Sequence, residues 1–149
     1  MLSAPKRGTI LAFDFGTRRI GVAVGEAATG LAHPLATIAA AKNDQRFAAI
    51  GALIDEWRPA LLLIGLPTHA DGSGHELTAR VRRFARQLEG RFGVAIALAD
   101  ERFTTRAAAD ALSAAGVDAR EQRRVRDRVA AQLILQAYLD QRRAPQRTA

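Results

Sequence analysis

The sequence predicts an α/β domain with a mixed five-stranded sheet and helices on both faces. Three observations support this prediction. Three short apolar segments follow one another at the start of the chain, which is typical of an antiparallel meander. After residue 42, apolar segments of strand length alternate with longer segments in which apolar residues recur at helical spacing. The 149 residues are 48% hydrophobic and 25% charged, a composition that suits a single globular domain spanning residues 1–149.

Three strands are expected at the start of the chain, over residues 9–15, 20–24 and 31–38. The first is almost wholly apolar, and Gly16 with Thr17 supplies the turn that follows it. In the second strand, branched residues alternate with Gly21 and Ala23, so the side chains on one of its faces are small. Pro34 cannot donate a ladder hydrogen bond, which favours an edge position for the third strand.

Helices and strands alternate in the rest of the chain. Asn43 can cap the first helix, and Pro59 ends it. The expected elements are a helix over 43–57, a strand over 60–64, a helix over 77–92, a strand over 94–99, a short helix from Thr104 or Thr105 to about 115, and a last helix from about 120 to 140. Residues 1–8 and 141–149 are expected to be flexible. This order of elements is the one expected of a ribonuclease H-like fold.

Composition and charge exclude several kinds of protein. The chain has no cysteine, which excludes disulfides, thiolate metal sites and thiol nucleophiles. No apolar run is long enough for a membrane helix, and the segment after Lys6 and Arg7 is too short for a signal peptide, so we expect a cytoplasmic protein without membrane contact. Lys and Arg number 22 against 15 Asp and Glu, and the net charge of +7 favours nucleic acid as the partner.

Asp14 is the first candidate for chemistry because it lies in an otherwise apolar strand. An unpaired buried carboxylate is costly, so this one is expected to meet a metal ion, a cation or several hydrogen-bond donors. Strand alternation places it with Ile10 and Ala12, on the face opposite Phe13 and Phe15. The alternative is a structural role in which the carboxylate accepts amides of the following turn.

Glu101 is the second candidate, because it follows the strand expected over residues 94–99. In open α/β sheets, ligands gather beyond the carboxyl ends of parallel strands. By alternation only one of Asp100 and Glu101 can share the face of Asp14, and alternation does not say which. The alternative is a surface loop in which a carboxylate pairs with Arg102.

Asp127 is the third candidate and lies on the last helix. It shares a side of that helix with Ala130 and Ala131, whose small side chains allow a close approach to the sheet. The alternative is an exposed carboxylate paired with Arg123 or Arg124. Three carboxylates from separate elements, with no cysteine, suit Mg²⁺ or Mn²⁺. Two such ions can activate water and stabilise the leaving oxygen in phosphodiester hydrolysis.

Four motifs resemble those of the YqgF (RuvX) family, and together they span about residues 10–139. They are FDFGTRRIGVA at 13–23, GLP at 65–67 with DG at 71–72, DERFTT at 100–105, and DRVAA at 127–131 followed by ILQAYL at 134–139. The family comprises bacterial ribonuclease H-like proteins described as Holliday junction resolvases and as nucleases that mature the 5′ end of pre-16S ribosomal RNA. The resemblance implies that Asp14, Glu101 and Asp127 form an acidic triad.

Six arginines are candidate contacts to the nucleic-acid backbone. Three lie near the motif carboxylates and three on the last helix: Arg18, Arg19, Arg102, Arg123, Arg124 and Arg128. Arg102 is equally suited to pair with Asp100. The phosphate contacts would be independent of base sequence, because they involve only the backbone charge.

The expected function is metal-dependent hydrolysis of phosphodiester bonds in structured RNA, in maturation of the 5′ end of pre-16S ribosomal RNA, by a monomer or weak homodimer. A resolvase of branched DNA is the first alternative, and its two symmetric cuts would require a dimer. A non-catalytic RNA-binding or transcription-associated factor is the second. The opening DFGT also resembles the phosphate-binding strand of sugar kinases and Hsp70-type ATPases, which need a second domain that 149 residues do not supply.

Overall fold

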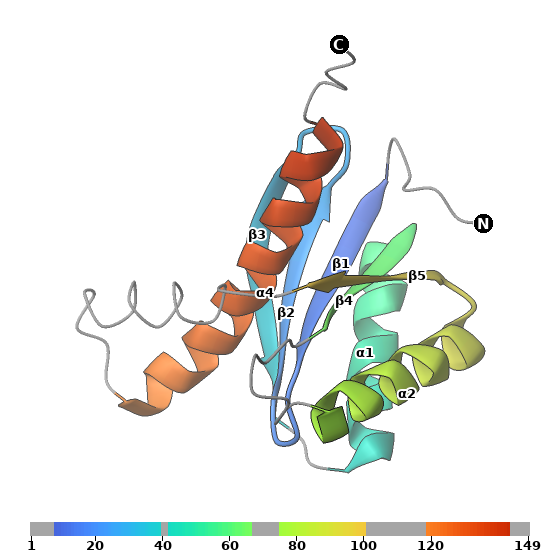
Figure 1. The fold of residues 1–149 in the computed structure, drawn as a ribbon, viewed down its shortest axis with the longest axis vertical. Helices are drawn as coiled ribbons and strands as arrows, with labels where there is room; N and C mark the ends of the chain where they lie inside the picture. The colour runs from blue at the N-terminus through green and yellow to red at the C-terminus, as the bar shows by residue number, and fades with distance from the viewer. Residues whose placement is uncertain (1–7, 40–41, 67–74, 101–118, 144–149) are drawn as a thin grey trace.

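The computed structural model describes residues 8–39, 42–66, 75–100 and 119–143, which form one sheet with helices on both sides (Figure 1). Its elements are β1 (Thr9–Phe15), β2 (Ile20–Glu26), β3 (Leu31–Ile38), α1 (Asn43–Trp57), β4 (Leu61–Leu66), α2 (His75–Phe92), β5 (Ala95–Asp100) and α4 (Ala119–Arg143). The short helix predicted from Thr104 or Thr105 lies outside the described residues, and each of the other predicted elements is present. Within the described ranges, none of the helices has the length and apolarity that a membrane span requires.

The five strands form a mixed sheet in the order β3-β2-β1-β4-β5. β1, β2 and β3 pair antiparallel, as predicted for a meander, whereas β4 joins β1 and β5 joins β4 in parallel. β3 is an edge strand, and its register with β2 shifts so that Ala23 pairs with Pro34 and Val22 with Ala36. Pro34 therefore lies at an edge and an irregularity, where a missing N–H is tolerated.

Two apolar cores lie on the two faces of the sheet (Figure 1). On one face α1 and α2 cover a core that includes Phe13, Ile64 and Phe84. On the other face α4 packs on a core that includes Ala12 and Leu63. Because helices cover both faces, β1 and β4 are buried on both sides and read in the sequence as continuous apolar runs. The predicted alternation of β1 is confirmed, since its successive residues belong to different cores.

The two ends of α1 differ in detail from the sequence prediction. Asn43 is the first helical residue and not the N-cap; Lys42 is the N-cap, and it makes no side-chain cap hydrogen bond. At the other end Arg58 adopts a left-handed conformation with a φ of 48°, and its N–H donates to the carbonyl of Ile54. Pro59 follows directly, so the helix ends where the sequence predicts.

Other elements extend beyond their predicted ends. α4 continues to Arg143, so residues 141–143 are helical and do not belong to a flexible tail. β2 continues to Glu26, whose carboxylate accepts a hydrogen bond from the hydroxyl of Thr9 on β1. β4 and β5 run on to Leu66 and Asp100, which pair with each other. The parallel part of the sheet is therefore longer at its carboxyl end, where the candidate site lies.

Candidate active site

Asp14 lies one residue before the carboxyl end of β1. Figure 1 shows this end of β1 at the lower end of the sheet. Ile10 and Ala12 belong to the core under α4, and Phe13 belongs to the opposite core, so alternation directs the Asp14 side chain to the α4 face. The residue is partly exposed, whereas the four residues before it are buried. Asp14 therefore lies in an apolar strand but is accessible to solvent, as a reactive carboxylate must be.

The α4 helix comes very close to the sheet at Gly21, which is the β2 residue paired with Asp14. A Cβ atom added to Gly21 would lie 1.8 Å from the carbonyl oxygen of Asp127. Ala130 and Ala131, one turn further along α4, are fully buried against the sheet. Residues paired across an antiparallel ladder have Cα atoms about 4.5–5.5 Å apart. The turn of α4 that carries Asp127 thus lies against the strand pair that carries Asp14.

The carboxylate of Asp127 pairs with Arg19, which immediately precedes β2. The Nε atom of Arg19 lies 2.5 Å from Oδ2 of Asp127, and the two side chains are 31% and 18% exposed. The sequence suggested Arg123 or Arg124 as the alternative partner on the same helix, but the observed partner is 108 residues away in the chain. The pair links α4 to β2 and neutralises one negative charge near Asp14.

The third predicted carboxylate, Glu101, and its neighbour Arg102 lie outside the described residues. The strand that leads to them is described: Ala95, Ala97 and Ala99 pack against the core under α4, which is the face of Asp14. Among the described residues, His, Asp and Glu form no group of three that could hold a metal ion. Asp14 and Asp127 are thus the two members of the predicted triad that the structure places on one face of the sheet.

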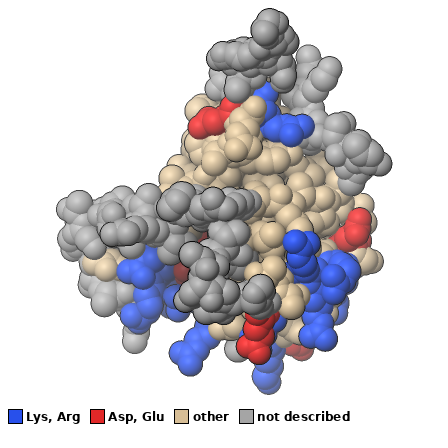
Figure 2. Space-filling model, in the orientation of Figure 1, with Lys and Arg blue, Asp and Glu red and all other residues tan. Residues whose placement is uncertain are grey.

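Basic side chains surround this end of the molecule. Arg18, Arg123 and Arg124 are exposed, and Figure 2 shows Lys and Arg gathered over α2 and over the first half of α4. Arg128 is partly buried, and its Nε donates to the hydroxyl of Thr37 at 3.3 Å. That hydroxyl in turn donates to the carbonyl of Arg124 at 2.6 Å, which ties β3 to α4. The backbone of α4 is therefore anchored while the side chains of Arg123 and Arg124 face solvent.

Sequence reasoning missed a second group of basic residues on the other face of the sheet. Arg46 of α1 is only 3% exposed, and it lines a cavity together with Arg80 and Arg83 of α2. A signal was present, because Arg46 precedes Ile50 by four positions and Leu53 by seven, which places a charge on the apolar stripe of α1.

The chain is similar to known proteins over nearly its whole length. Residues 8–141 match the family RuvX, described as Holliday junction resolvase. A protein of Nitrosospira multiformis named "Putative pre-16S rRNA nuclease" is 54% identical over 142 residues, which cover 95% of this chain and 94% of the relative. A protein of the same name from Chromobacterium violaceum is 54% identical over 132 residues, which cover 88% of this chain and 96% of the relative.

A solved structure shares the fold at much lower sequence identity. RuvC of Thermus thermophilus, in a structure described as a complex with Holliday junction substrate, superposes with a TM-score of 0.55 and 15% identity, covering 90% of this chain and 95% of RuvC. This likeness confirms the predicted ribonuclease H-like fold. Since the family match covers nearly the whole chain and the relatives exceed half identity over almost their full length, the chain belongs to the RuvX family.

Proposed function

We propose that this protein is a divalent-metal-dependent nuclease that hydrolyses phosphodiester bonds in the 5′-end maturation of pre-16S ribosomal RNA, in the cytoplasm. One observation carries the proposal: the Asp127 turn of α4 packs on Gly21, directly opposite Asp14. Two carboxylates from elements far apart in the sequence thereby occupy one end and one face of the sheet. The names of the relatives support the RNA substrate.

Asp14, Glu101 and Asp127 are the proposed catalytic residues and metal ligands. Carboxylate oxygens are hard ligands that suit Mg²⁺ or Mn²⁺, and the chain has no thiol that would favour a softer metal. In the strand before Glu101, Ala95, Ala97 and Ala99 share the face of Asp14, and Glu101 has the same parity in the sequence. This parity favours Glu101 over Asp100 as the third ligand. When bound, two ions would activate the attacking water and stabilise the leaving oxygen.

The residues of the chain itself have distinct roles in this proposal. Asp14 provides a carboxylate near the end of β1, which is the central strand of the sheet and is packed on both faces. Arg19 orients the carboxylate of Asp127 through its Nε atom. The positive charge of Arg19 lies at the same end of the molecule as Asp127, and in this proposal it also attracts a substrate phosphate. Arg18, Arg102, Arg123, Arg124 and Arg128 are proposed to contact the nucleic-acid backbone.

Cleavage of branched DNA is the second candidate, and the fold shared with RuvC in its Holliday junction complex favours it. Resolution of a junction needs two symmetric cuts, and so two active sites in a dimer. Processing of one RNA end needs a single active site, which a monomer or a weak homodimer supplies.

A nuclease assay with three substrates in parallel tests the proposal. Pre-16S ribosomal RNA, a four-way DNA junction and single-stranded RNA are each incubated with Mg²⁺ or Mn²⁺, and products are mapped by length. We expect cleavage of the precursor near its 5′ end, and loss of cleavage when the metal is chelated. Preferential and symmetric cutting of the junction would favour the resolvase instead. No cleavage of any substrate would favour a non-catalytic RNA-binding factor.

Removal of two positive charges from α4 tests the proposed backbone contacts. Arg123→Gln with Arg124→Gln is expected to weaken binding of structured RNA equally for different sequences. The slope of log K against log salt concentration should fall by roughly one unit for each phosphate that is no longer neutralised. The fold should be unaffected, because both side chains are exposed and the hydrogen bond from Thr37 reaches the backbone of Arg124.

Arg142→Gln is the matched control for this experiment. Arg142 lies on the same helix and is exposed, but it is 18 residues beyond Arg124, which is about 27 Å along an α-helix. Its guanidinium lies 5.4 Å from the ring centroid of Tyr138 and not near Asp127. An unchanged salt slope in the double variant, or an equal fall in the control, would show that Arg123 and Arg124 are an ordinary solvated surface.

A further inference from the structure

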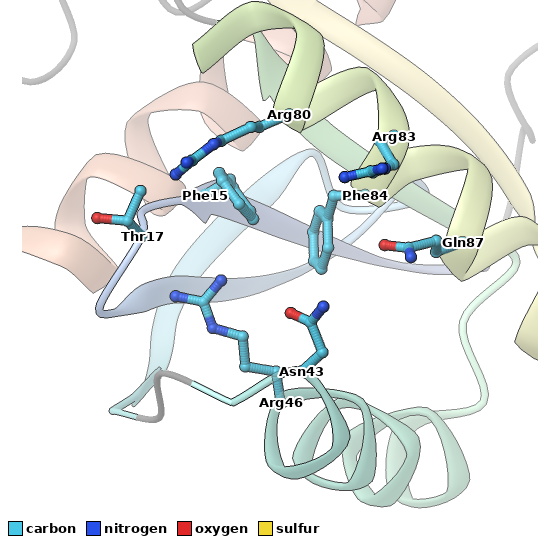
Figure 3. Close-up of a pocket in the computed structure, with 8 residues that line it drawn as sticks. All are labelled: Phe15, Thr17, Asn43, Arg46, Arg80, Arg83, Phe84 and Gln87. Atoms are coloured by element: carbon cyan, nitrogen blue, oxygen red, sulfur yellow. The ribbon is translucent and has the colours of Figure 1, made fainter. Parts of the chain in front are cut away.

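A cavity outside the candidate active site opens at the same end of the sheet, between the end of β1, the start of α1 and the helix α2 (Figure 3). Its volume is about 250 Å³. Phe15 and Phe84 form part of its wall, with ring centroids 4.9 Å apart. Phe15 follows Asp14 directly and packs against the core under α1 and α2, so the cavity and Asp14 lie on opposite faces of the sheet.

Three arginines line this cavity: Arg46 from α1, and Arg80 and Arg83 from α2. In Figure 3 the side chains of Arg80 and Arg83 lie beside the two phenylalanine rings, and Arg46 extends toward the end of β1 from the opposite side of the cavity. None of the eight lining residues shown is Asp or Glu. In the part of the chain that the structure describes, no carboxylate forms an ion pair with Arg80 or Arg83.

Arg46 is the buried member of the three. Its Nη2 atom donates to the carbonyl of Gly16 at 2.6 Å, and its guanidinium lies 5.3 Å from the centroid of the Phe15 ring. Burial lowers the pKa of Arg46, because the charged form loses solvation on leaving water.

The start of α1 borders the cavity, and Asn43, the first helical residue, lines it. The carboxylate of Asp44 in the same turn accepts the N–H of Gln45 at 2.9 Å, which offsets the partial positive charge of the helix start. The anion chemistry of the cavity therefore comes from the arginines. Three guanidinium groups and two aromatic rings line one cavity without a described lining carboxylate.

We propose that this cavity binds a phosphate group of the nucleic-acid strand on which the protein acts. We infer binding of an anion from the three arginines, and we infer that the anion belongs to a nucleic-acid strand from the proposed function. Guanidinium groups bind phosphate oxygens in bidentate geometry, and aromatic rings stack on the bases or sugars of single strands. A terminal phosphate and an internal phosphodiester share this chemistry. With one contact on each face, the strand would pass around the end of the sheet that carries Asp14.

A pair of matched double variants tests the proposal. Arg80→Gln with Arg83→Gln removes two charges that line the cavity, and Arg82→Gln with Arg86→Gln removes two exposed charges from the same helix that do not line it. Arg46 is kept, because it is buried and bonded to the turn after β1. The probe is a single-stranded 12-nucleotide RNA with a 3′ fluorophore, made with either a 5′-phosphate or a 5′-hydroxyl. Binding is measured by anisotropy in EDTA, where no cleavage occurs.

The cavity variant is expected to bind the RNA at least about tenfold more weakly than the wild type, since it can no longer form hydrogen bonds between charged groups. Its salt slope should fall by about 0.7 for each phosphate that is no longer neutralised. The control variant should weaken binding by less than about threefold, because Arg82 and Arg86 are exposed, as are Arg80 and Arg83, but lie outside the cavity. A greater effect on 5′-phosphorylated RNA would identify a terminal phosphate as the ligand, and an equal effect on both RNAs would identify an internal phosphodiester.

Two results would overturn the proposal. Equal weakening by the two double variants would mean that α2 contributes only a diffuse positive field. The cavity would instead belong to a free anion if two results were found together. RNA binding would be unchanged in the cavity variant, and inorganic phosphate would raise the melting temperature of the wild type but not of the variant. Because metal is absent, RNA binding that depends on the cavity would support this proposal even if the protein cleaved no substrate, and the nuclease proposal alone would then fail.

Discussion

Asp14→Asn is expected to lower phosphodiester cleavage by about 10²–10³-fold or more while the fold stays intact. A bound divalent ion supplies several kcal/mol of transition-state stabilisation, and each 1.36 kcal/mol changes the rate about tenfold. Asn has nearly the shape of Asp but carries no charge, so the variant removes a proposed metal ligand without creating a cavity. The partly exposed position at the end of β1 tolerates the neutral amide.

The effect on metal binding is measurable without cleavage. An ion that binds the folded state alone raises the melting temperature, so Mn²⁺ should stabilise the wild type and stabilise Asp14→Asn much less. In EDTA the melting temperature of the variant should stay close to that of the wild type, because Asn has nearly the shape of Asp and the position is partly exposed. Asp55→Asn, an exposed carboxylate on α1, is the matched control and should behave as wild type in both assays. Wild-type cleavage by Asp14→Asn would refute the proposed mechanism.

Much of the fold was predictable from the sequence, because buried positions recur at the spacing of a strand or a helix and are filled by apolar residues. β1 and β4 are covered on both faces, so they read as continuous apolar runs between turn residues. The faces within the site were also predictable. Alternation places Asp14 on the α4 face, and the small residues Gly21 and Ala131 mark where the helix can approach the strand.

Contacts between distant parts of the chain were not predictable from local pattern. Arg19 pairs with Asp127 across 108 residues, and no spacing rule selects it over the nearer arginines of α4. Arg46 combines with Arg80 and Arg83 because α1 and α2 lie side by side on the same face of the sheet. A single sequence shows such arginines as scattered charges, and only the packing of the helices brings them to one cavity.

The two helix ends that differ from the sequence prediction could not be placed from residue type alone. Asn43 has the residue type of an N-cap, but it is the first helical residue and lines the cavity beside α2. Near the end of α4 the guanidinium of Arg142 lies 5.4 Å from the ring centroid of Tyr138, four residues earlier, and such pairs stabilise a last turn.

Gly21→Ala is expected to displace α4 and to lower both stability and cleavage. The added Cβ would lie 1.8 Å from the carbonyl oxygen of Asp127, 2.2 Å from its carbonyl carbon and 2.9 Å from the nitrogen of Arg128. All three are backbone atoms, so no side-chain rotation relieves the clash, and the helix must shift by about 1 Å or more. Overpacking of this kind costs about 1–3 kcal/mol, which corresponds to a melting temperature lower by about 3–12 °C. A shift of about 1 Å between catalytic groups costs about 10²-fold in rate.

Gly90→Ala separates this specific contact from a general effect of replacing glycine. Gly90 lies in α2, is exposed, and a Cβ there would meet nothing within 4 Å. Alanine is the better helix former by about 0.5–1 kcal/mol, so this variant should melt at a slightly higher temperature and cleave at the wild-type rate. If Gly21→Ala instead kept wild-type stability and cleavage, the contact between β2 and α4 would be looser than the structure has it. Asp127 would then not be held beside Asp14, and the proposed active site would lose the observation that carries it.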